Sequence, residues 1–459
     1  MHTRGKVSAK SSANLEEITL TSVEVPWGRE EALEVKLPPD WHLIAEGQFD
    51  TPPAMDDLSG ALRKALDAPI LSPPLREMVG PESRIALVMD DESRPTPVDR
   101  LAPLLLKCLL EAGAQPENIT GLFAPGTHEP MTRAQMRARA GGYVFSTIDC
   151  RCCDCHEEES LVFLGQTERG TPVWLNRIAA QADLRILIGT IEPHPQAGFG
   201  GGFKNLLPGL AGAESIGHNH LLMPSPDRYN MIGTLPEGNP MRQDLEEAGR
   251  ILSGPTFIVN VVLDPALEPV AVVCGDAIAA HGAGVEIARS IYGVRLTHQA
   301  DVVVTNAYPM DQDLRQAGKA ILNAAGACKP GGLIIGFLRC EDGLRNVDLP
   351  PFVPPLGAAR ALAKVLGSRG ISLLSQHLPA RVPVEDRFLV NFALQMLKDY
   401  HVLIFSPRLK QDSQGRFPPV LYDDQELLFE EAARLLARAD AEVAVFTHGG
   451  ISFPIVGAG

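Results

Sequence analysis

The sequence predicts an α/β protein with two domains and mainly parallel sheets. From residue 84 onward, apolar β-branched runs alternate with segments of helical periodicity, which is the pattern of parallel strands covered by helices. The chain has 459 residues, which is more than a single hydrophobic core usually serves. The alternation also restarts after residue 284, so we expect a second domain there.

The first half is expected to contain five strands and two main helices. The strands are continuous apolar runs, as in strands buried on both faces, and the helices carry apolar residues at helical spacing. The expected strands cover 84–91, 118–126, 182–194, 256–264 and 269–276, and the expected helices cover 97–114 and 132–140.

A helix at 277–293 leads into the second half. Strands are expected there at 300–308, 333–340 and 401–407, with helices at 313–329, 384–400 and 423–439. We place an N-terminal domain at 21–283 and a C-terminal domain at 284–414. Residues 415–459 are expected to return to the first domain and complete it.

The composition is that of an ordinary folded protein, with 45% hydrophobic and 21% charged residues. The net charge of −15 argues against a nucleic-acid partner, because phosphate binding requires clustered Lys and Arg. No apolar run approaches the roughly 18 residues that a membrane helix needs, so we expect no membrane partner. Residues 1–20 are polar and lack the apolar core of a signal peptide. We therefore expect a loose leader and a cytoplasmic location.

A glycine-rich loop, "IEPHPQAGFGGGFKNLLPG" at 191–209, contains one lysine, Lys204. Walker loops need a glycine before the lysine and a hydroxyl after it, but Phe203 and Asn205 occupy those positions. A dinucleotide-binding fingerprint starting at Gly198 also fails at Phe203. The glycines still permit close approach of the backbone to a bulky group. Lys204 can serve as a point charge or, when desolvated, as a nucleophile.

Four histidines lie near this loop or near a strand end. His128 follows the expected strand at 118–126, His194 precedes the glycines, and His218 and His220 follow Lys204. A single histidine is more often a packed residue than a catalyst. Several near the carboxyl ends of parallel strands favour metal binding or proton transfer near neutral pH.

Two further groups of polar residues have competing interpretations. Asp91 and Arg94, in "DDESRPTP", either bind a polar ligand at the edge of the sheet or pair with each other in a turn. Arg315, Gln316 and Lys319 begin an expected helix, where residues four apart share a face. They form either a carboxylate clamp or a solvated basic face.

Four cysteines crowd into "DCRCCDCHEEE" and are followed by a histidine: Cys150, Cys152, Cys153, Cys155 and His156. Thiolates are ligands for soft metals, so a zinc or copper site is one interpretation. Zinc knuckles, however, use two separated pairs, and no second pair follows here. We favour a surface loop of free thiols.

Taken together, these segments resemble the nickel-pincer-nucleotide lactate racemase family from about residue 84 to residue 345. The resemblance is carried, in order, by "DDESRPTP", "GTHEP", "IEPHPQAGFGGGFKNLLPG", "HNH" and "YPMDQDLRQAGKA". It implies that residues 21–283 form a cofactor-binding domain and that the active site lies in the cleft between the two domains. The implied cofactor is pyridinium-3-thioamide-5-thiocarboxylic acid mononucleotide with Ni(II), which separate biosynthesis proteins make.

The resemblance also implies a role for each matching residue. Lys204 would tether the cofactor through a thioamide, His220 would complete the coordination of nickel, and His128 and His194 would be the acid/base pair. Gln316 and Lys319 would bind the substrate carboxylate, with Arg315 beside them. The remaining expected cofactor-binding residues are Asp91, Arg94, Gly200, Gly201 and Gly202.

The implied reaction is inversion of the carbinol carbon of a 2-hydroxy acid, by proton-coupled hydride transfer to and from the tethered cofactor. Two alternatives stay open: a zinc-dependent hydrolase or lyase that uses the same histidines, and a non-catalytic carrier of nickel or cofactor. Arg315 stands where the family often has tyrosine. This cation would favour a second carboxylate or a polyhydroxylated acid, or it would form a salt bridge, and lactate itself is left open.

Overall fold

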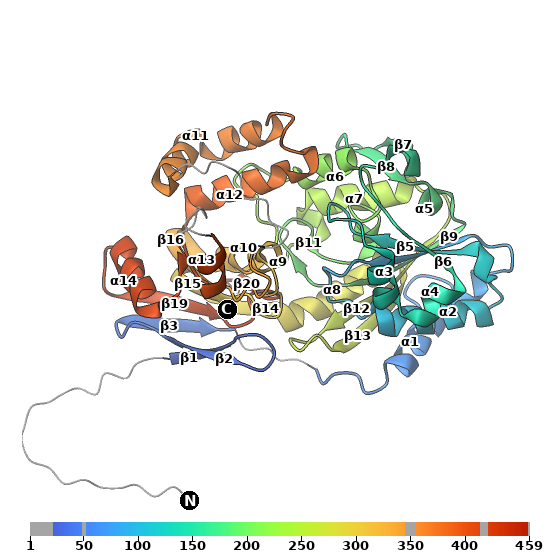
Figure 1. Ribbon diagram of the computed structural model, residues 1–459, viewed down its shortest axis with the longest axis horizontal. Coiled ribbons are helices and arrows are strands. Elements are labelled where there is room, and N and C mark those ends of the chain that lie inside the picture. Colours follow the sequence, from blue (N-terminus) through green and yellow to red (C-terminus); the bar gives the residue numbers. More distant parts are fainter. Residues whose placement is uncertain (1–21, 48–51, 345–354, 414–420, 458–459) are drawn as a thin grey trace, which may run out of the picture.

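The computed structural model describes residues 22–47, 52–344, 355–413 and 421–457, so the expected leader at 1–20 lies outside the described residues. Two six-stranded sheets, each covered by helices, form the two lobes of the molecule (Figure 1). Most strand pairs are parallel, and the α/β class predicted from the sequence is confirmed.

The first sheet has the order β13-β12-β9-β4-β5-β6, and only the β12–β13 pair is antiparallel. Its strands are β4 (Ile85–Asp90), β5 (Ile119–Ala124), β6 (Asp149–Cys152), β9 (Leu184–Thr190), β12 (Thr256–Leu263) and β13 (Pro269–Asp276). The central strands are continuous buried runs because helices cover both faces of the sheet.

Separate apolar cores lie on the two faces of this sheet. One core lies beneath α1 (Leu58–Asp67), α2 (Val98–Glu111), α3 (Arg133–Ala140) and α4 (Gly142–Thr147). The other lies beneath α5 (Arg177–Gln181), α6 (Ala213–His220), α7 (Pro240–Ile251) and the hairpin of β7 (Leu161–Gln166) and β8 (Pro172–Asn176).

The second sheet is parallel throughout, with the order β18-β17-β16-β15-β19-β3. Its strands are β3 (Trp41–Glu46), β15 (Ala300–Asn306), β16 (Cys328–Phe337), β17 (His401–Phe405), β18 (Leu421–Tyr422) and β19 (Ala441–Phe446). One face packs against α9 (Leu314–Ala317), α10 (Lys319–Ala324) and α12 (Arg387–Asp399), and α11 (Leu356–Gln376) packs against α12. The other face packs against α14 (Gln425–Leu436), β1 (Ser22–Pro26) and β2 (Ala32–Lys36).

The expectation that residues 415–459 complete the first domain is wrong for the strands β18 and β19, although Ile451 and Phe453 do pack in a core with Phe199 of the first lobe. In the described part of that segment, β18 and β19 belong to the second sheet, and β20 (Phe453–Val456) pairs with β14 (Gly293–Leu296). The other end of the chain joins the same lobe, because β3 pairs with β19 at the sheet edge (Figure 1). Partners of parallel strands come from distant parts of the chain, so local sequence patterns do not reveal them.

The expected division between residues 283 and 284 falls inside a continuous helix, α8 (Ala279–Tyr292). This helix packs against β12 and β13 of the first sheet and leads directly into β14. It therefore connects the lobes as a rigid element. The remaining described helix, α13 (Pro407–Ser413), follows β17.

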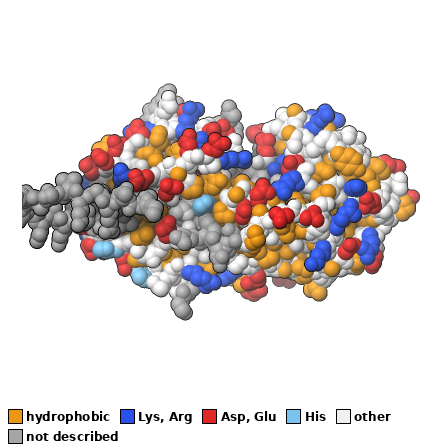
Figure 2. Space-filling model, turned by 90° about the horizontal axis from the view of Figure 1, so that it is seen from below, with side chains coloured by type: hydrophobic (Ala, Val, Ile, Leu, Met, Phe, Trp, Pro, Cys, Tyr) orange, Lys and Arg blue, Asp and Glu red, His pale blue; other side chains and the backbone are white. Residues whose placement is uncertain are grey.

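Charged side chains are mixed on the surface. On the face shown in Figure 2, Lys and Arg are interspersed with Asp and Glu, so the net charge of −15 is not gathered into a single acidic patch there. None of the helices in the described ranges is both long enough and apolar enough to cross a membrane.

Arg185 is a charged residue within the otherwise apolar strand β9, and it is fully buried. Its Nη1 donates hydrogen bonds to the carbonyl oxygens of Ala179, at 3.1 Å, and Ala182, at 2.9 Å. Its Nη2 donates to the carbonyl oxygens of Ser253 and Gly254, the latter at 2.7 Å. The guanidinium thus joins the end of α5 to the segment before β12.

We predict that Arg185→Met lowers the free energy of unfolding by about 3–5 kcal/mol, because buried carbonyl groups lose their donor. The measurement is urea denaturation followed by circular dichroism. Arg84→Met is the matched control, since the Arg84–Asp183 ion pair is largely exposed and exposed pairs contribute little to stability. Equal losses of stability in the two variants would contradict the role assigned to Arg185.

Candidate active site

A cavity of about 350 Å³ lies between the two lobes. From the first lobe it is lined by segments that follow β4, β5 and β9, and from the second by α9, α10 and α12. The chain leaves β4 toward β5 and β6 on one side and later returns to β9 and β12 on the other. Ligands of open α/β sheets bind at such a reversal, outside the carboxyl ends of the strands.

Most of the residues singled out from the sequence meet at this cavity. Its lining includes Arg94, His128, His194, Lys204, His220, Arg315, Gln316 and Lys319. A smaller pocket of about 40 Å³ shares three of these residues and is also lined by Asp91, Gly200 and Gly201. Gly202 lines neither cavity, and His218 instead lies 2.8 Å from the hydroxyl of Thr171.

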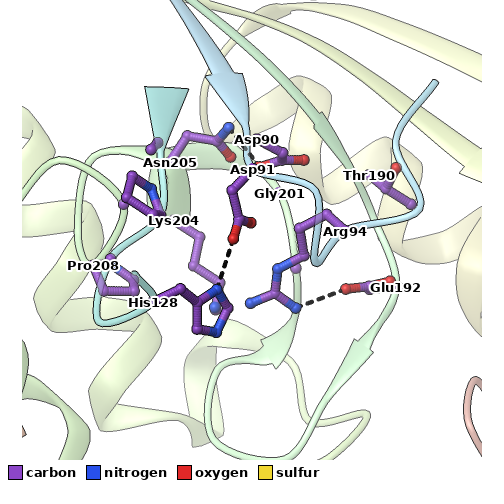
Figure 3. Close-up of a pocket in the computed structure, with 15 residues that line it drawn as sticks. Asp90, Asp91, Arg94, His128, Thr190, Glu192, Gly201, Lys204, Asn205 and Pro208 are labelled. Atoms are coloured by element: carbon purple, nitrogen blue, oxygen red, sulfur yellow. Dashed lines mark hydrogen bonds and ion pairs between the residues drawn. The ribbon is translucent and has the colours of Figure 1, made fainter. Parts of the chain in front are cut away.

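His128 is held by a carboxylate. Its Nδ1 lies 2.8 Å from Asp91 Oδ2, and Figure 3 shows the two side chains pointing toward each other. Ser93, which the sequence analysis did not single out, donates to Asp91 Oδ1 at 2.8 Å. Burial lowers the pKa of His128 and outweighs the opposing effect of Asp91. His128 is therefore a neutral imidazole whose Nδ1–H faces Asp91 and whose Nε2 is free to accept a proton.

Burial acts to raise the pKa of Asp91, but the hydrogen bond from His128, together with the charge of Arg94, brings that pKa below its ordinary value. Asp91 is therefore a carboxylate near neutral pH. It fixes both the orientation and the tautomer of the imidazole, because an ionised carboxylate can only accept a hydrogen bond.

His194 is held in the opposite tautomer. It lies in a short hairpin of β10 (Pro193–His194) and β11 (Gly198–Phe199). Its Nδ1 accepts hydrogen bonds from the backbone N–H groups of Gln196, at 3.2 Å, and Ala197, at 3.1 Å. Burial, together with the nearby cation Arg94, holds the pKa of His194 well below its usual range. The neutral ring therefore carries its proton on Nε2.

Lys204 lies in η4 (Gly202–Asn205) and is only 7% exposed. Burial, followed by the neighbouring charges of Arg94 and Lys319, holds the pKa of Lys204 well below its ordinary value. An unprotonated amine of this kind is a nucleophile. In Figure 3 its side chain extends toward His128 and Arg94.

Two buried polar side chains that the sequence analysis missed form hydrogen bonds with the backbone carbonyl oxygens of the glycine loop. Arg242 of α7 donates to the carbonyl oxygens of Ala197, at 3.3 Å, Phe199, and Gly201, at 3.4 Å. His281 Nε2 lies 2.8 Å from the carbonyl oxygen of Gly200. The sequence gives no signal for Arg242, which lies among other polar residues of α7, whereas His281 interrupts the small apolar residues that begin α8.

The glycines are required by the packing of the loop itself. Gly201 has φ of 71° and would place a Cβ 2.7 Å from Asn260 Oδ1. Asn260 Oδ1 also accepts the backbone N–H of Gly202 at 2.8 Å. The bare backbone thus allows the loop to approach β12, and this contact sets the position of Lys204.

His220 ends α6 with one ring nitrogen already engaged. Its Nδ1 donates to the carbonyl oxygen of Ile216 at 2.9 Å, which leaves the lone pair of Nε2 free. Burial, together with the nearby cations Arg315 and Arg94, lowers the pKa of His220 to about 3. A neutral imidazole oriented by a backbone carbonyl is the usual form of a metal-ligating histidine.

Cationic side chains make one side of the cavity suited to an anion. Arg94 Nη1 lies 3.0 Å from Glu192 Oε1, as Figure 3 also shows. Lys319 Nζ donates to Gln316 Oε1, and burial, followed by the charge of Arg94, lowers the pKa of Lys319 to about 7. The expected continuous helix is interrupted at Gly318, but the side chains before and after it line the same cavity.

The four cysteines of the Cys150–His156 cluster are free, but the expected surface loop is wrong. Cys150 packs in the core on one face of the first sheet, and Cys153 and Cys155 pack in the core on the other. Burial raises the pKa of Cys150 to about 11 and that of Cys153 and Cys155 to about 12. These thiols are protonated packing groups, whereas soft-metal ligands are thiolates.

Within the described ranges, no group of three or more His, Cys, Asp and Glu side chains is arranged to hold a metal ion. A zinc enzyme of the kind considered above uses three protein ligands at its metal. The geometry thus provides His220 with a free Nε2, in the same cavity as an amine that can form a covalent bond.

The sequence matches two family models. The lactate racemase N-terminal domain matches residues 28–231, and the lactate racemase C-terminal domain matches residues 296–452. Lactate racemase of Lactiplantibacillus plantarum is 33% identical over 356 residues, which are 76% of this chain and 80% of that one. Lactate racemase of Thermoanaerobacterium thermosaccharolyticum is 30% identical over 330 residues, which are 71% and 76% of the two chains.

Solved structures show the same fold. The lactate racemase apoprotein of T. thermosaccharolyticum has a TM-score of 0.78 at 24% identity, covering 95% of this chain and all of that one. A Thermotoga maritima protein has a TM-score of 0.61 at 16% identity, covering 88% of this chain. With both domain models matched in order and two relatives aligned over most of its length, the chain belongs to the lactate racemase family.

Proposed function

We propose that the protein is a racemase or epimerase that inverts the carbinol carbon of a 2-hydroxy acid with a lysine-tethered nickel-pincer nucleotide. The observation that carries this proposal is the pair of neutral histidines, His128 and His194, in one cavity with Lys204 and His220. His128 and His194 suit proton transfer at a substrate. Lys204 and His220 suit attachment of a metal-bearing cofactor.

The donor chemistry of the chain fits the proposed cofactor. Lys204 supplies a buried amine with a lowered pKa, which would hold the cofactor as a thioamide by replacing the oxygen of a thiocarboxylic acid, with release of water. His220 supplies a free Nε2, and imidazole nitrogen is a good ligand for nickel(II). When bound, the cofactor supplies an acceptor and donor of hydride for the carbinol carbon.

The proposed mechanism assigns the proton transfers to this chain. His128, with Nε2 unprotonated, accepts the proton of the 2-hydroxyl group in one enantiomer while Asp91 stabilises the resulting imidazolium. The Nε2–H of His194 donates a hydrogen bond to the same oxygen, and His194 would accept the hydroxyl proton of the other enantiomer only in the form whose Nε2 is unprotonated. Gln316 and Lys319 hold the carboxylate, so that the planar keto-acid intermediate stays between the two histidines.

The relatives named as lactate racemases support an isomerase, and proteins that build the cofactor are the proposed partners. All eight cysteines are free thiols, which is typical of a reducing compartment, and we propose the cytoplasm.

The first prediction concerns the tether. Protein produced together with the cofactor-building enzymes is expected to carry a covalent mass increment and about one nickel per chain. Lys204→Ala is expected to lose both, and His220→Ala to keep the increment but lose most of the nickel. Intact mass and metal analysis measure these quantities. Lys107→Ala, at an exposed position on α2, is the control that keeps both. A covalent mass increment that persists in Lys204→Ala would contradict the assignment of Lys204 as the attachment point of the cofactor.

The second prediction concerns the proton transfers. His128→Asn and His194→Asn are each expected to reduce kcat by about 10²–10⁴, the usual contribution of a positioned acid or base, while keeping the mass increment. Chiral chromatography of the product measures the rate. His218→Asn is the matched control, because His218 faces Thr171 rather than the cavity. Near-normal rates in both active-site variants would refute the assignment.

The third prediction concerns pH. Asp91 acts to raise the pKa of His128, so Asp91→Asn is expected to lower that pKa further. The acid limb of kcat/KM should then move to lower pH, while kcat falls by about tenfold or more because the imidazole loses its orientation. Asp99→Asn, exposed in the first turn of α2, is the control. An unchanged pH profile in Asp91→Asn would exclude coupling between Asp91 and His128.

A further inference from the structure

One wall of the cavity is apolar and comes from the second lobe. Five of its side chains lie on one face of α12, at the helical positions i, i+1, i+4, i+5 and i+8, and a sixth comes from α10. The wall consists of Phe388, Leu389, Phe392, Ala393, Met396 and Leu322.

This wall is fixed in position by the core beneath the second sheet and by Tyr229. Phe392 and Met396 are each 6% exposed and belong to the core beneath the second sheet. The ring of Phe392 packs edge-on against Tyr229, with a centroid distance of 5.7 Å, and the hydroxyl of Tyr229 donates to Met396 Sδ at 3.4 Å. The apolar surface is therefore a fixed part of the cavity.

The wall also borders the proposed reaction centre. The ring of Phe388 lies 5.0 Å from the ring of His220, centroid to centroid. The carboxylate-binding groups Gln316 and Lys319 lie in the same cavity. A molecule whose carboxylate binds Gln316 and Lys319 would therefore have an apolar surface beside its other end, next to His220, the proposed metal ligand.

Arg315, the cation that would serve a second carboxylate, already has partners. Its Nη2 donates to Thr127 Oγ1 at 3.3 Å and lies 3.8 Å from Asp386 Oδ1. These contacts connect α9 to the segment before His128 and to η7 (Val384–Asp386). The structure favours the salt-bridge interpretation of Arg315 over a dicarboxylate site.

We infer that the substrate is a 2-hydroxy acid with an extended apolar side chain, branched aliphatic or aromatic, whose substituent packs against the wall formed by α12 and Leu322. This inference rests on the proposed function for the reaction itself. The methyl group of lactate would leave most of the wall without a partner, and the hydroxyls of a sugar acid would lose hydrogen bonds on it.

The test compares substrates with the cofactor-loaded enzyme. Chiral chromatography gives kcat/KM for 2-hydroxy-4-methylpentanoate, 3-phenyllactate, lactate, malate and gluconate. At least one of the two apolar acids is expected to exceed lactate by about tenfold or more, since a single methylene in an apolar pocket is worth about 10–200-fold. Preference for lactate, malate or gluconate would overturn the inference and leave the proposed reaction standing.

Two variants test the wall itself, both at positions exposed enough to accept a new side chain. Leu389→Lys, at a residue 44% exposed, is expected to raise the ratio of malate to 2-hydroxy-4-methylpentanoate turnover by about tenfold. Ala393→Phe is expected to reduce turnover of the larger acids relative to lactate, because it occupies their space. Leu373→Lys, 59% exposed on α11 and away from the cavity, is the control. Unchanged substrate ratios in both wall variants would contradict the role of α12.

A binding measurement separates this inference from the reaction. Calorimetry on cofactor-free protein compares 2-oxo-4-methylpentanoate with pyruvate, and the larger acid is expected to bind at least about tenfold more tightly. Equal affinities would overturn the apolar ligand class. If loaded protein inverts no acid yet keeps this binding preference, the proposed reaction fails while the ligand class holds.

Discussion

The candidate site depends on a buried guanidinium, that of Arg242, which donates to backbone carbonyls of the glycine loop. A loop with only a two-residue hairpin and one short helical turn leaves several carbonyl groups in need of donors, and here they lie in the interior, out of reach of water. Burial lowers the pKa of Arg242 to about 10, so the cation remains charged near neutral pH. His194 precedes the held segment and Lys204 follows it, so one arginine fixes the position of both.

The two lobes meet beside this loop with little space between them. A Cβ at Gly217 of α6 would lie 2.8 Å from the backbone of Val384 in the second lobe. Nearby, His156 Nε2 lies 3.1 Å from Glu385 Oε1. These contacts lie on the segments that precede His220 and the apolar wall of α12. The relative position of the lobes therefore sets the distance between the proposed metal ligand and the proposed substrate-binding surface.

Much of the first sheet and of the site could be predicted, because buried strands are apolar runs and the polar residues that end them meet at one edge. Asp91 and His128 follow strands directly, and the structure brings them within hydrogen-bonding distance. The assignment of the chain's ends could not be predicted, since β3 finds its partner β19 some 400 residues away. Arg242 and His281 were missed because their role arises only from tertiary contact with a loop that local sequence does not place.

The buried amine of Lys204 has a consequence for the order in which a working site is assembled. Burial, with the neighbouring charges of Arg94 and Lys319, holds the pKa of this amine well below its ordinary value, so the empty chain presents it unprotonated and ready to form a bond. An amide or thioamide nitrogen takes up no proton, so attachment at Lys204 would keep this position uncharged at any pH. Because that bond needs only the amine, it would form first, and the histidines would act on what it holds. A single covalent bond would thus convert a receptor for the cofactor into a catalyst.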